Sequence, residues 1–315
     1  MLQKEKLINK VHNLVIDEEL SGQRLDNFLF NKLKNVPKSR IYRMLRGGEV
    51  RVNKKRAAPS YKIQSDDLIR IPPFWAEETL SKGKPGSNLI KLLLDAIIFE
   101  DNRILVINKP SGIASHGGSG INFGVIETLR AARPDLKNLE LVHRLDRDTS
   151  GCLILAKKRS ALRELHKLIF DGAILKKYVL LVRGQWQGGE RAVDASLLKN
   201  QLKSGERMVT IDHQGKDSLT IFRPLKVGIV ASLIEAELKT GRTHQIRVHA
   251  LHIGYPIAGD EKYGDSEFNA KMKELGFKRM FLHAEKISFC WATKEKVEFV
   301  AKLDKELEEF LKVLK

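Results

Sequence analysis

LELVHRLDRDTSGCLILAKK, residues 139–158, places a dense group of charged side chains between two apolar segments. The apolar LELV and CLILA are typical of strands, so HRLDRDTSG, residues 143–151, is predicted to be a loop at the edge of a sheet. A loop held by strands can present a carboxylate to a ligand. Two aspartates beside arginines are also typical of a structural ion-pair network, and this stretch alone favours that interpretation over catalysis.

Strand and helix patterns alternate on both sides of this loop. Apolar runs predict buried strands at ILVINKP (104–110), CLILAKK (152–158) and YVLLVRG (178–184). The spacing of apolar residues in SALRELHKLIF, residues 160–170, predicts a helix between the last two strands. The larger part of the chain is therefore expected to mix strands with helices.

The remainder of the chain continues this pattern. SLIEAELKTG, residues 232–241, predicts a strand that leads into a helix over 244–253, for which Thr243 is the expected cap and Gly254 the expected end. LDKELEEFLKVLK, residues 303–315, predicts a surface helix. Such intermixing indicates an α/β or α+β domain.

The amino-terminal part has a different pattern. SGQRLDNFLFNKLKN (21–35) and PKSRIYRMLRGG (37–48) each carry apolar residues at helical spacing, with Ser21 and Ser39 as expected start signals and the glycine pair as the end of the second helix. Two short strand-like pieces follow, before a pair of prolines interrupts the pattern. This part is predicted to be a small domain of two helices and short strands.

The domain boundaries follow from composition. Residues 1–75 are predicted to form the first domain, whose short strands are VRVN (50–53) and DLIRI (67–71). The polar segment AEETLSKGKPGSNLI contains Gly and Pro and has little periodicity, so 76–90 is interpreted as a linker. The second domain is expected to span 91–315.

The second helix and the strand after it carry a dense basic surface. Between Lys32 and Arg56 there are ten lysines and arginines and one acid, Glu49. Such a surface repels itself, and we favour phosphate binding over a merely solvated helix face. The candidate substrate-binding residues on it are Arg40, Arg43, Arg46, Lys54, Lys55 and Arg56.

Composition indicates a globular protein with a polyanionic partner. Of the 315 residues, 42% are hydrophobic, and the formal net charge of +17 favours nucleic acid. The apolar stretch from Leu92 to Phe99 is broken by Asp95, and the start of the chain has no signal-peptide pattern. We therefore expect a soluble, cytoplasmic protein, and nothing demands more than a monomer.

The chain has two cysteines, Cys152 and Cys290, and no CxxC pair. This number is too small for a disulfide framework or a structural zinc site built from thiolates. Both cysteines are expected in the core, in a reducing compartment, although the sequence leaves a bridge between them open.

The charged loop is accompanied by NKPSG (108–112), KKYVLLVRG (176–184) and GRTHQIRVH (241–249). In this order and spacing, these motifs resemble the catalytic domain of the pseudouridine synthases that act on large-subunit ribosomal RNA, from about Ile98 to the end of the chain. The phrases RLDNFL, SRIYRML, GEVRVN and SDDLIRI, within residues 14–73, resemble a small RNA-binding domain first described in a ribosomal small-subunit protein.

This resemblance implies an α+β fold and an RNA isomerase. The small helical-plus-strand RNA-binding domain should precede a larger catalytic domain with a mixed, mainly antiparallel sheet and flanking helices. The family's aspartate nucleophile falls on Asp146, its tyrosine on Tyr178 and its carboxylate-pairing arginine on Arg247. The base-displacing arginine falls on Arg144, and Arg242, in the same motif as Arg247, is expected to bind substrate.

The implied reaction converts specific uridines of large-subunit (23S) ribosomal RNA into pseudouridine after the base is flipped out of the RNA. A carboxylate suits it because covalent carboxylate catalysis at an anomeric carbon is known from glycosidases. The RNA has the same atomic composition before and after the reaction, and no redox step occurs. We therefore expect no cofactor. The sequence leaves open whether Asp146 acts on the sugar as nucleophile or as base.

Arg247 is predicted to point into a partly apolar site. On the expected helix its near neighbours are Ile246, Ala250 and Leu251, and a buried guanidinium needs a partner. Pairing with Asp146 would keep that carboxylate ionised and aimed. On this basis, replacement of Arg247 by Met is expected to lower activity more than stability.

Other interpretations remain open. Transfer RNA is an alternative substrate, and a non-catalytic RNA-binding assembly factor or a hydrolytic glycosylase is an alternative function. A zinc site at His244, His249 and His252 is not favoured, because their spacing lacks the HExxH pattern and Arg247 would repel a cation. HGGSG (116–120) lacks the GK[ST] ending of a nucleotide-binding loop, so a flexible substrate loop is expected there.

Overall fold

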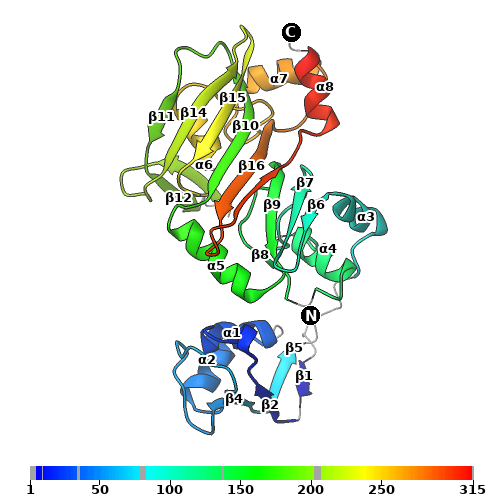
Figure 1. Cartoon of the computed structure of the whole chain (residues 1–315), viewed down its shortest axis with the longest axis vertical. Coiled ribbons are helices and arrows are strands. Elements are labelled where there is room, and N and C mark those ends of the chain that lie inside the picture. Colours follow the sequence, from blue (N-terminus) through cyan, green and yellow to red (C-terminus); the bar gives the residue numbers. More distant parts are fainter. Residues whose placement is uncertain are drawn as a thin grey trace. The chain divides into compact units, whose positions relative to one another are not determined.

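The computed structural model describes residues 5–8, 10–33, 36–77, 83–118, 120–136, 138–201 and 207–313 (Figure 1). The chain divides into two compact units, Met1–Lys84 and Pro85–Lys315. In the described ranges, no helix is both long enough and apolar enough to cross a membrane.

The first unit packs two helices against short strands. The order β2-β4-β3 makes a three-stranded sheet, and β1 pairs with β5. Its elements are β1 (Glu5–Ile8), β2 (His12–Val15), the 3-10 helix η1 (Glu18–Leu20), α1 (Leu25–Lys32), α2 (Lys38–Arg46), β3 (Arg51–Val52), β4 (Leu68–Ile71) and β5 (Phe74–Glu77). Apolar residues at helical spacing, such as Leu25, Leu29 and Ile41, are buried against Ile69 and Ile71 of β4. The predicted pair of helices is therefore confirmed.

The predicted helix starts in this unit are wrong. Ser21 ends the short helix η1, and α1 begins only after Arg24, which makes no side-chain cap. Similarly, α2 begins after Pro37, so that Ser39 lies inside the helix. A proline can open a helix because its φ is already near the helical value and its missing N–H would have no partner there. The predicted end of the second helix at the glycine pair is confirmed, since Gly47 is the C-cap residue of α2.

The segment interpreted as a linker, 76–90, includes regular structure at both ends. Its first residues belong to β5, and its last residues begin α3, Ser87–Asp95. Residues 78–82 lie outside the described part of the chain. The helix was missed because GSNLIKLLLD begins among the Gly, Pro and Ser residues that had marked the linker.

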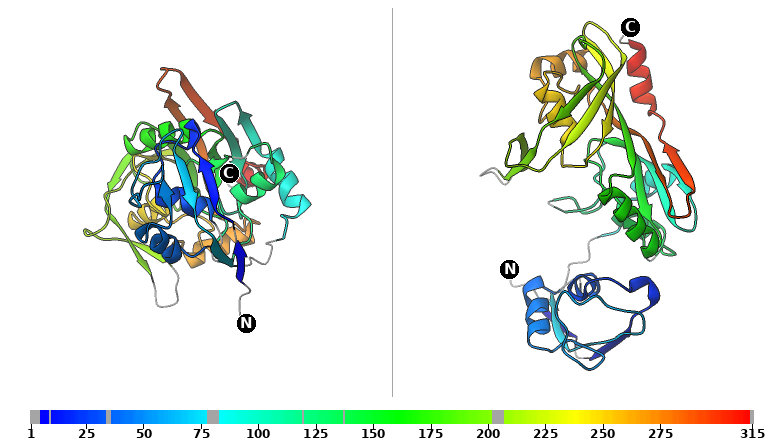
Figure 2. Two further views of the ribbon diagram at one scale, coloured as in Figure 1. Left: turned by 90° about the horizontal axis from the view of Figure 1, so that it is seen from below. Right: turned by 60° about the vertical axis from the view of Figure 1, so that its left-hand side comes forward.

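The second unit contains a ten-stranded sheet in the order β11-β14-β15-β10-β16-β9-β7-β6, with β17 beside β16 and β8 beside β9. Its described pairs are antiparallel, except for the parallel pair of β9 with β16. The α+β class with a mixed, mainly antiparallel sheet is confirmed. A separate hairpin, β12 with β13, stands apart from this sheet (Figure 2).

The strands and helices of this unit are α3, β6 (Ile97–Glu100), β7 (Ile104–Lys109), α4 (Val125–Ala132), β8 (Glu140–Leu141), β9 (Ser150–Ala156), α5 (Arg159–Phe170), β10 (Leu175–Arg183), β11 (Arg191–Asp194), β12 (Leu197–Gln201), β13 (Arg207–Ile211), β14 (Leu219–Lys226), β15 (Ala231–Leu238), α6 (Gln245–His252), α7 (Ser266–Glu274), β16 (Leu282–Cys290), β17 (Lys296–Val300) and α8 (Lys305–Val313).

The central strands are buried on both faces, which explains their continuous apolar runs. Along β9, Leu153 and Leu155 pack in the cluster that contains residues of α4 and α6, whereas Cys152 and Ile154 pack with residues of α5. Alternate side chains of a strand point to opposite faces, so helices on both sides require apolar residues at every position. On β10, Leu181 faces a third cluster, with α7 and α8.

Two sequence expectations about single residues need correction. Cys152 is buried, as expected, but Cys290 is exposed at the end of β16, and both thiols are free. Thr243 does not cap α6; the residue before the helix is His244, and the side-chain oxygen of Gln245 accepts the Arg242 N–H at 2.9 Å. The expected end of this helix at glycine 254 is confirmed.

Candidate active site

The loop between β8 and β9 carries Asp146 and is held by the end of β7 and the segment that follows it. Lys109, the last residue of β7, and Ser111 and Ser115 after it each donate a hydrogen bond to a carbonyl of the loop, at 3.0, 2.8 and 2.7 Å. The loop is thus fixed through its main chain, which leaves its charged side chains available. A strand pair and a second loop together determine where Asp146 lies.

Lys109 is a fully buried cation beneath this loop. Its ammonium group donates to three main-chain carbonyls at 2.7, 2.8 and 3.0 Å, which matches the three protons of a charged lysine. Burial lowers the pKa of Lys109 to about 7, although the charges of Asp148 and Asp146 oppose that effect. The carbonyls and the acids therefore offset only part of the loss of water around the amine.

Arg247 of α6 lies between two carboxylates. Its Nη1 donates to Oδ2 of Asp146 at 3.1 Å, so the ion pair expected from the sequence is present. Its Nε and Nη2 form a bidentate pair with Asp260 at 2.7 and 2.8 Å. Asp260 is 1% exposed and Asp146 is 30% exposed, so the buried acid anchors the guanidinium and the accessible one faces solvent. Leu251, expected to line a partly apolar site with Arg247, is instead exposed.

Electrostatic interactions keep both Arg247 and Asp260 ionised. Burial by itself lowers the pKa of Arg247, but the hydrogen bonds and charge of Asp260, with those of Asp146, raise it overall. Burial raises the pKa of Asp260, and the bidentate guanidinium more than reverses this. A charged Arg247 at pH 7 therefore holds the Asp146 carboxylate in one orientation.

Asp146 opens on a pocket of about 1020 Å³. The pocket is lined by the β8–β9 loop, the glycine-rich segment around residues 111–121, the start of α6 and the loops near residues 260 and 279. Its charged lining residues are Arg144, Asp146, Arg147, Asp148, Arg247, Asp260, Glu261, Lys262, Lys278, Arg279 and Glu306. Such a polar, partly cationic cavity suits a ligand that carries both hydrogen-bonding groups and negative charge.

Arg144 lies on this lining and is exposed. The alternative role as an ion-pair partner of Asp146 or Asp148 is not observed, because Asp148 pairs with Arg147 at 3.0 Å. Within the described ranges, the Arg144 guanidinium has no hydrogen bond or ion pair. It is therefore available to a ligand two residues from the carboxylate.

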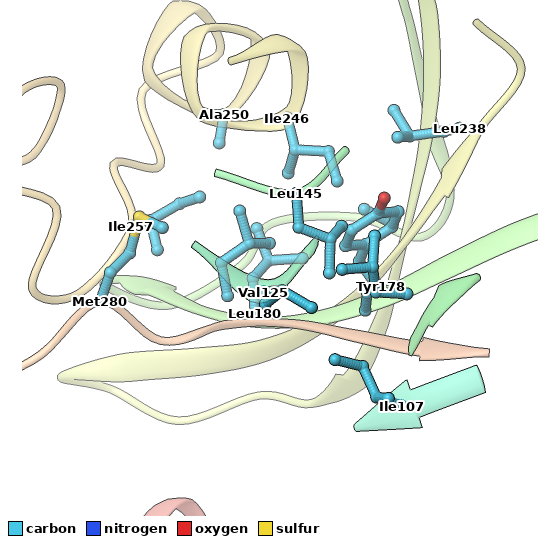
Figure 3. Close-up of a cluster of buried hydrophobic side chains, with 14 of the residues drawn as sticks. Ile107, Val125, Leu145, Tyr178, Leu180, Leu238, Ile246, Ala250, Ile257 and Met280 are labelled. Carbon is cyan, nitrogen blue, oxygen red and sulfur yellow. The ribbon is translucent and has the colours of Figure 1, made fainter. Parts of the chain in front are cut away.

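Tyr178 of β10 lies beneath the pocket rather than on its lining. It is 8% exposed and packs in the same apolar cluster as Leu145 and Ile246. Figure 3 shows its ring beside Leu145, with the hydroxyl oxygen turned away from Ile107. Burial, and then the nearby charge of Asp146, raise the pKa of Tyr178, so the phenol is neutral at pH 7.

The candidate residues of the first unit form a surface on that unit. Arg40 makes a bidentate pair with Glu49 at 2.8 and 2.9 Å, so the single acid of this basic stretch neutralises one of its cations. The other members, Arg43, Arg46, Lys54, Lys55 and Arg56, are exposed. Arg56 also covers Gly48, where a Cβ atom would come within 2.5 Å of its Nε.

Arg242, the remaining candidate, is exposed, and its Nε donates to the carbonyl of Asp217 at 3.1 Å. It does not line the pocket. Sequence reasoning missed three residues that do shape the site: Asp260, Lys109 and His244. A signal for Asp260 existed, since a buried guanidinium already facing one exposed carboxylate leaves other N–H groups to satisfy.

The three histidines of HQIRVHALH do not converge. His249 is buried, with Nδ1 at 2.9 Å from Thr220 and Nε2 at 3.0 Å from the Ala195 carbonyl, whereas His252 is exposed. Over the described ranges, no group of His, Cys, Asp or Glu side chains has an arrangement that could hold a metal ion.

Comparisons with known proteins match both units. The family described as "RNA pseudouridylate synthase" matches residues 103–252, and the family described as "S4 domain" matches residues 23–69. A protein named "Ribosomal large subunit pseudouridine synthase C" from Haemophilus influenzae is 53% identical over 316 residues, which cover 99% of this chain and 98% of that protein.

The chain belongs to the RNA pseudouridine synthase family. A second relative of this synthase, with the same name and from Escherichia coli K12, is 50% identical over 310 residues, which cover 97% of each chain. The family is one of isomerases, and its matched region in this synthase contains Asp146, Tyr178 and Arg247.

Solved structures agree with this assignment. "Human RNA Pseudouridylate Synthase Domain Containing 4" superposes with a TM-score of 0.60 at 25% identity, covering 72% of this synthase and 95% of that chain. "Human RNA Pseudouridylate Synthase Domain Containing 1" gives 0.55 at 27% identity, covering 70% and 86%. The mixed sheet and its helices are thus those of known pseudouridine synthases.

Proposed function

We propose that this protein isomerises specific uridines of large-subunit (23S) ribosomal RNA to pseudouridine, with Asp146 as the nucleophilic carboxylate. The observation that carries the proposal is an accessible Asp146 fixed by Arg247 at 3.1 Å on the wall of a pocket of about 1020 Å³. The choice of large-subunit RNA is supported by the names of full-length relatives that are 50% and 53% identical.

The reaction balances without any added reagent. The bond from ribose C1′ to uracil N1 breaks, the base turns, and C1′ joins uracil C5. The proton that leaves C5 is replaced by one gained at N1, so the mass is unchanged. In our proposal the Asp146 carboxylate attacks the sugar and holds it as an ester while the base turns. Arg247 holds the carboxylate in position for this attack.

Arg144 would fill the space left by the extruded base. The reacting bond is not accessible inside stacked RNA, and unstacking one base costs roughly a few kcal/mol. The planar guanidinium of Arg144 is exposed beside Asp146 and can stack on the neighbouring bases. We propose this role for Arg144 in base flipping.

Tyr178 would accept or relay the proton that leaves C5. Its hydroxyl belongs to a buried, neutral phenol whose pKa is raised by burial and by Asp146. Replacement of Tyr178 by Phe keeps the ring and removes proton handling. We expect Tyr178→Phe to bind RNA with the wild-type Kd and to lose at least about 100-fold in single-turnover rate.

The exposed lysines and arginines of the first unit would bind the RNA backbone. Arg43, Arg46, Lys54, Lys55 and Arg56 are available for phosphate contacts, and the net charge of +17 favours a polyanion. Arg40 and Arg242 each already have a protein partner, so we propose secondary contacts for them. We propose action in the cytoplasm as a monomer, without metal or cofactor.

The decisive experiment compares wild type with Asp146→Asn, which has nearly the same shape and no ionisable carboxyl. The substrate is 23S ribosomal RNA transcript labelled with tritium at uracil C5. Wild type is expected to release tritium at defined uridines, and to leave the mass of an unlabelled transcript unchanged. Asp146→Asn should fold normally by circular dichroism, bind the RNA and release no tritium. A folded Asp146→Asn protein with the normal rate would contradict the proposal.

The same assay separates the alternatives. A glycosylase would leave abasic sites and a lower RNA mass. A non-catalytic assembly factor would bind without releasing tritium. Release from transfer RNA but not from 23S RNA would favour the transfer RNA alternative.

A further inference from the structure

His244 occupies an unusual position at the edge of the pocket. Its backbone has φ +54° and ψ 19°, in the left-handed region that residues other than glycine rarely adopt. It is the residue before α6, but its side chain makes no capping hydrogen bond, so side-chain capping does not explain the conformation. The side chain is 17% exposed and lines the pocket beside Arg247. Such strain at a pocket edge suggests that the orientation of this ring matters to function.

The hydrogen bonds around Tyr263 determine which ring nitrogen of His244 carries the proton. Tyr263 is 4% exposed, and its hydroxyl oxygen accepts the main-chain N–H of Val209 at 3.0 Å. Its own proton needs an acceptor, and the one present among the described residues is Nδ1 of His244, at 2.9 Å. The phenol therefore donates to Nδ1, and the proton of the neutral imidazole is on Nε2.

The protonated Nε2 faces the reactive carboxylate without bonding to it. Nε2 lies 3.8 Å from Oδ2 of Asp146, which is too long for a direct hydrogen bond. Burial lowers the pKa of His244, Arg247 lowers it further and Asp146 opposes this, so the ring is neutral at pH 7. The N–H is thus an oriented donor that no residue in the described part of the chain accepts, beside the carboxylate that we propose to attack the sugar.

We infer that the Nε2–H of His244 donates a hydrogen bond to an oxygen next to the reacting bond of the bound uridine, either uracil O2 or the ribose 2′-hydroxyl. This inference rests on the proposed function. When the bond from C1′ to N1 breaks, its electron pair moves into the uracil ring and increases the charge on O2, where a fixed donor stabilises it. A donor to the 2′-hydroxyl would instead orient the sugar and distinguish RNA from DNA. In both cases the proton stays on His244.

Tyr263 is a positioning residue in this arrangement. Its ring packs edge to face against His244 at 5.5 Å and lies under the Arg247 guanidinium at 4.9 Å. Tyr263 is absent from the pocket lining. Tyr263→Phe keeps this packing but lets the His244 proton move to Nδ1, so kcat should fall while KM is preserved. The opposite split, with KM raised and kcat kept, would contradict the positioning role.

The test uses the full-length protein and a short RNA with one target uridine. Three versions of the RNA carry uridine, 2-thiouridine or 2′-deoxyuridine at the target. Single-turnover rates and Kd are measured for wild type, His244→Ala, His244→Leu and His244→Gln. The matched control is His252→Ala, an exposed histidine in the last turn of the same helix.

On the uridine RNA we expect His244→Ala to be about 100-fold slower, the typical loss for one transition-state donor, with Kd changed less than about threefold. His244→Gln, which retains an N–H, should recover at least about tenfold of this loss. On the modified RNA that lacks the true acceptor, the defect of His244→Ala should shrink to below about threefold, because the two changes remove one interaction. His252→Ala should match wild type.

The outcome on the modified RNAs identifies the acceptor. Loss of the defect with 2-thiouridine assigns uracil O2, and loss with 2′-deoxyuridine assigns the 2′-hydroxyl. Equal defects on all three RNAs, or wild-type rates for His244→Ala, would overturn the inference. If His244→Ala does not fold, His244→Leu, which fills the space without a donor, takes its place. Failure of the proposed function itself is distinct, since wild type would then form no pseudouridine.

Discussion

At the scale of single residues, Arg247 depends on an acid that the sequence did not reveal. The helix pattern predicted that Arg247→Met would lower activity more than stability. Asp260, however, is 1% exposed, and its carboxylate is held by the bidentate guanidinium. Removal of one partner of a buried ion pair leaves the other charge uncompensated.

We therefore expect Arg247→Met to lose stability as well as activity. The free energy of unfolding should fall by about 3–5 kcal/mol, measured by urea denaturation at pH 7. The double variant Arg247→Met/Asp260→Leu removes both charges and should recover most of that stability while remaining inactive. A single variant as stable as wild type would show that Asp260 does not depend on the guanidinium.

His143, three residues before Asp146, makes stability depend on pH. Its Nε2 accepts the Ile154 N–H at 3.2 Å, which requires the neutral ring. Burial, with some contribution from Lys176, lowers the pKa of His143 to about 4, compared with an ordinary value of 6.5. Between these pH values the unfolded chain binds a proton that the folded protein does not.

The neutral His143 ring thus makes its full contribution to the free energy of unfolding above pH 6.5, and this contribution is lost as the pH falls to about 4. We expect wild type to lose on the order of 2 kcal/mol more than His143→Gln over this range, after allowing for the partial exposure of the ring. Urea unfolding of both proteins at several pH values measures the difference, in which other titrating groups cancel. Parallel curves would contradict the prediction.

At the scale of secondary structure, the long apolar patterns were predictable and the helix starts were not. The strands β7, β9 and β10 and the helix α5 were identified because burial on two faces, or on one helical face, leaves a regular pattern. The starts of α1, α2 and α6 depend on local geometry that several polar residues nearby could supply. The start of α3 was hidden in a polar segment for the same reason.

Only some residues of the candidate site could be predicted from the sequence. Asp146 and Arg247 lie in motifs whose spacing resembles a known family, and their pairing followed from the helix pattern. The need for a second acid beside Arg247 could be inferred, but its position at Asp260 and the orientation of His244 depend on loops and on a left-handed residue, for which a single sequence gives no pattern. The hydrogen bond from Lys109 to the Arg147 carbonyl joins residues 38 positions apart, which no local pattern indicates.

Gly151 determines how closely β9 and β16 approach beside the loop that carries Asp146. It has φ +111° and pairs with Ala284 in the parallel part of the sheet. A Cβ atom at this position would lie 2.6 Å from the Ala284 nitrogen. We expect Gly151→Ala to cost about 3 kcal/mol or more, from the clash and the backbone strain together.

Thermal unfolding of Gly151→Ala beside Gly189→Ala would test this. Gly189 is exposed, its φ is outside the left-handed region and a Cβ there meets nothing within 4 Å, so its substitution should leave Tm nearly unchanged. Equal Tm values for the two variants would rule out the proposed close approach.

At the scale of the whole molecule, the positive charge predicts how RNA affinity responds to salt. Removal of one phosphate-binding side chain should make the plot of log affinity against log salt less steep by roughly one unit or slightly less. Arg43 and Arg46 are exposed, whereas Arg40 is paired with Glu49.

We expect Arg43→Gln/Arg46→Gln to make the salt dependence of RNA affinity less steep by about 1–2 units of slope, and Arg40→Gln to change the slope much less. Filter binding of 23S RNA fragments across a salt series measures this, and equal slopes would refute it.

The two units have separate hydrophobic cores. The cluster of the first unit lies entirely within residues 16–74, and the clusters of the second begin at Leu93. Because each unit has a buried apolar cluster of its own, calorimetry should resolve two melting events. It also follows that the amino-terminal module could be exchanged for another RNA binder, so that the same chemistry is delivered to a different transcript.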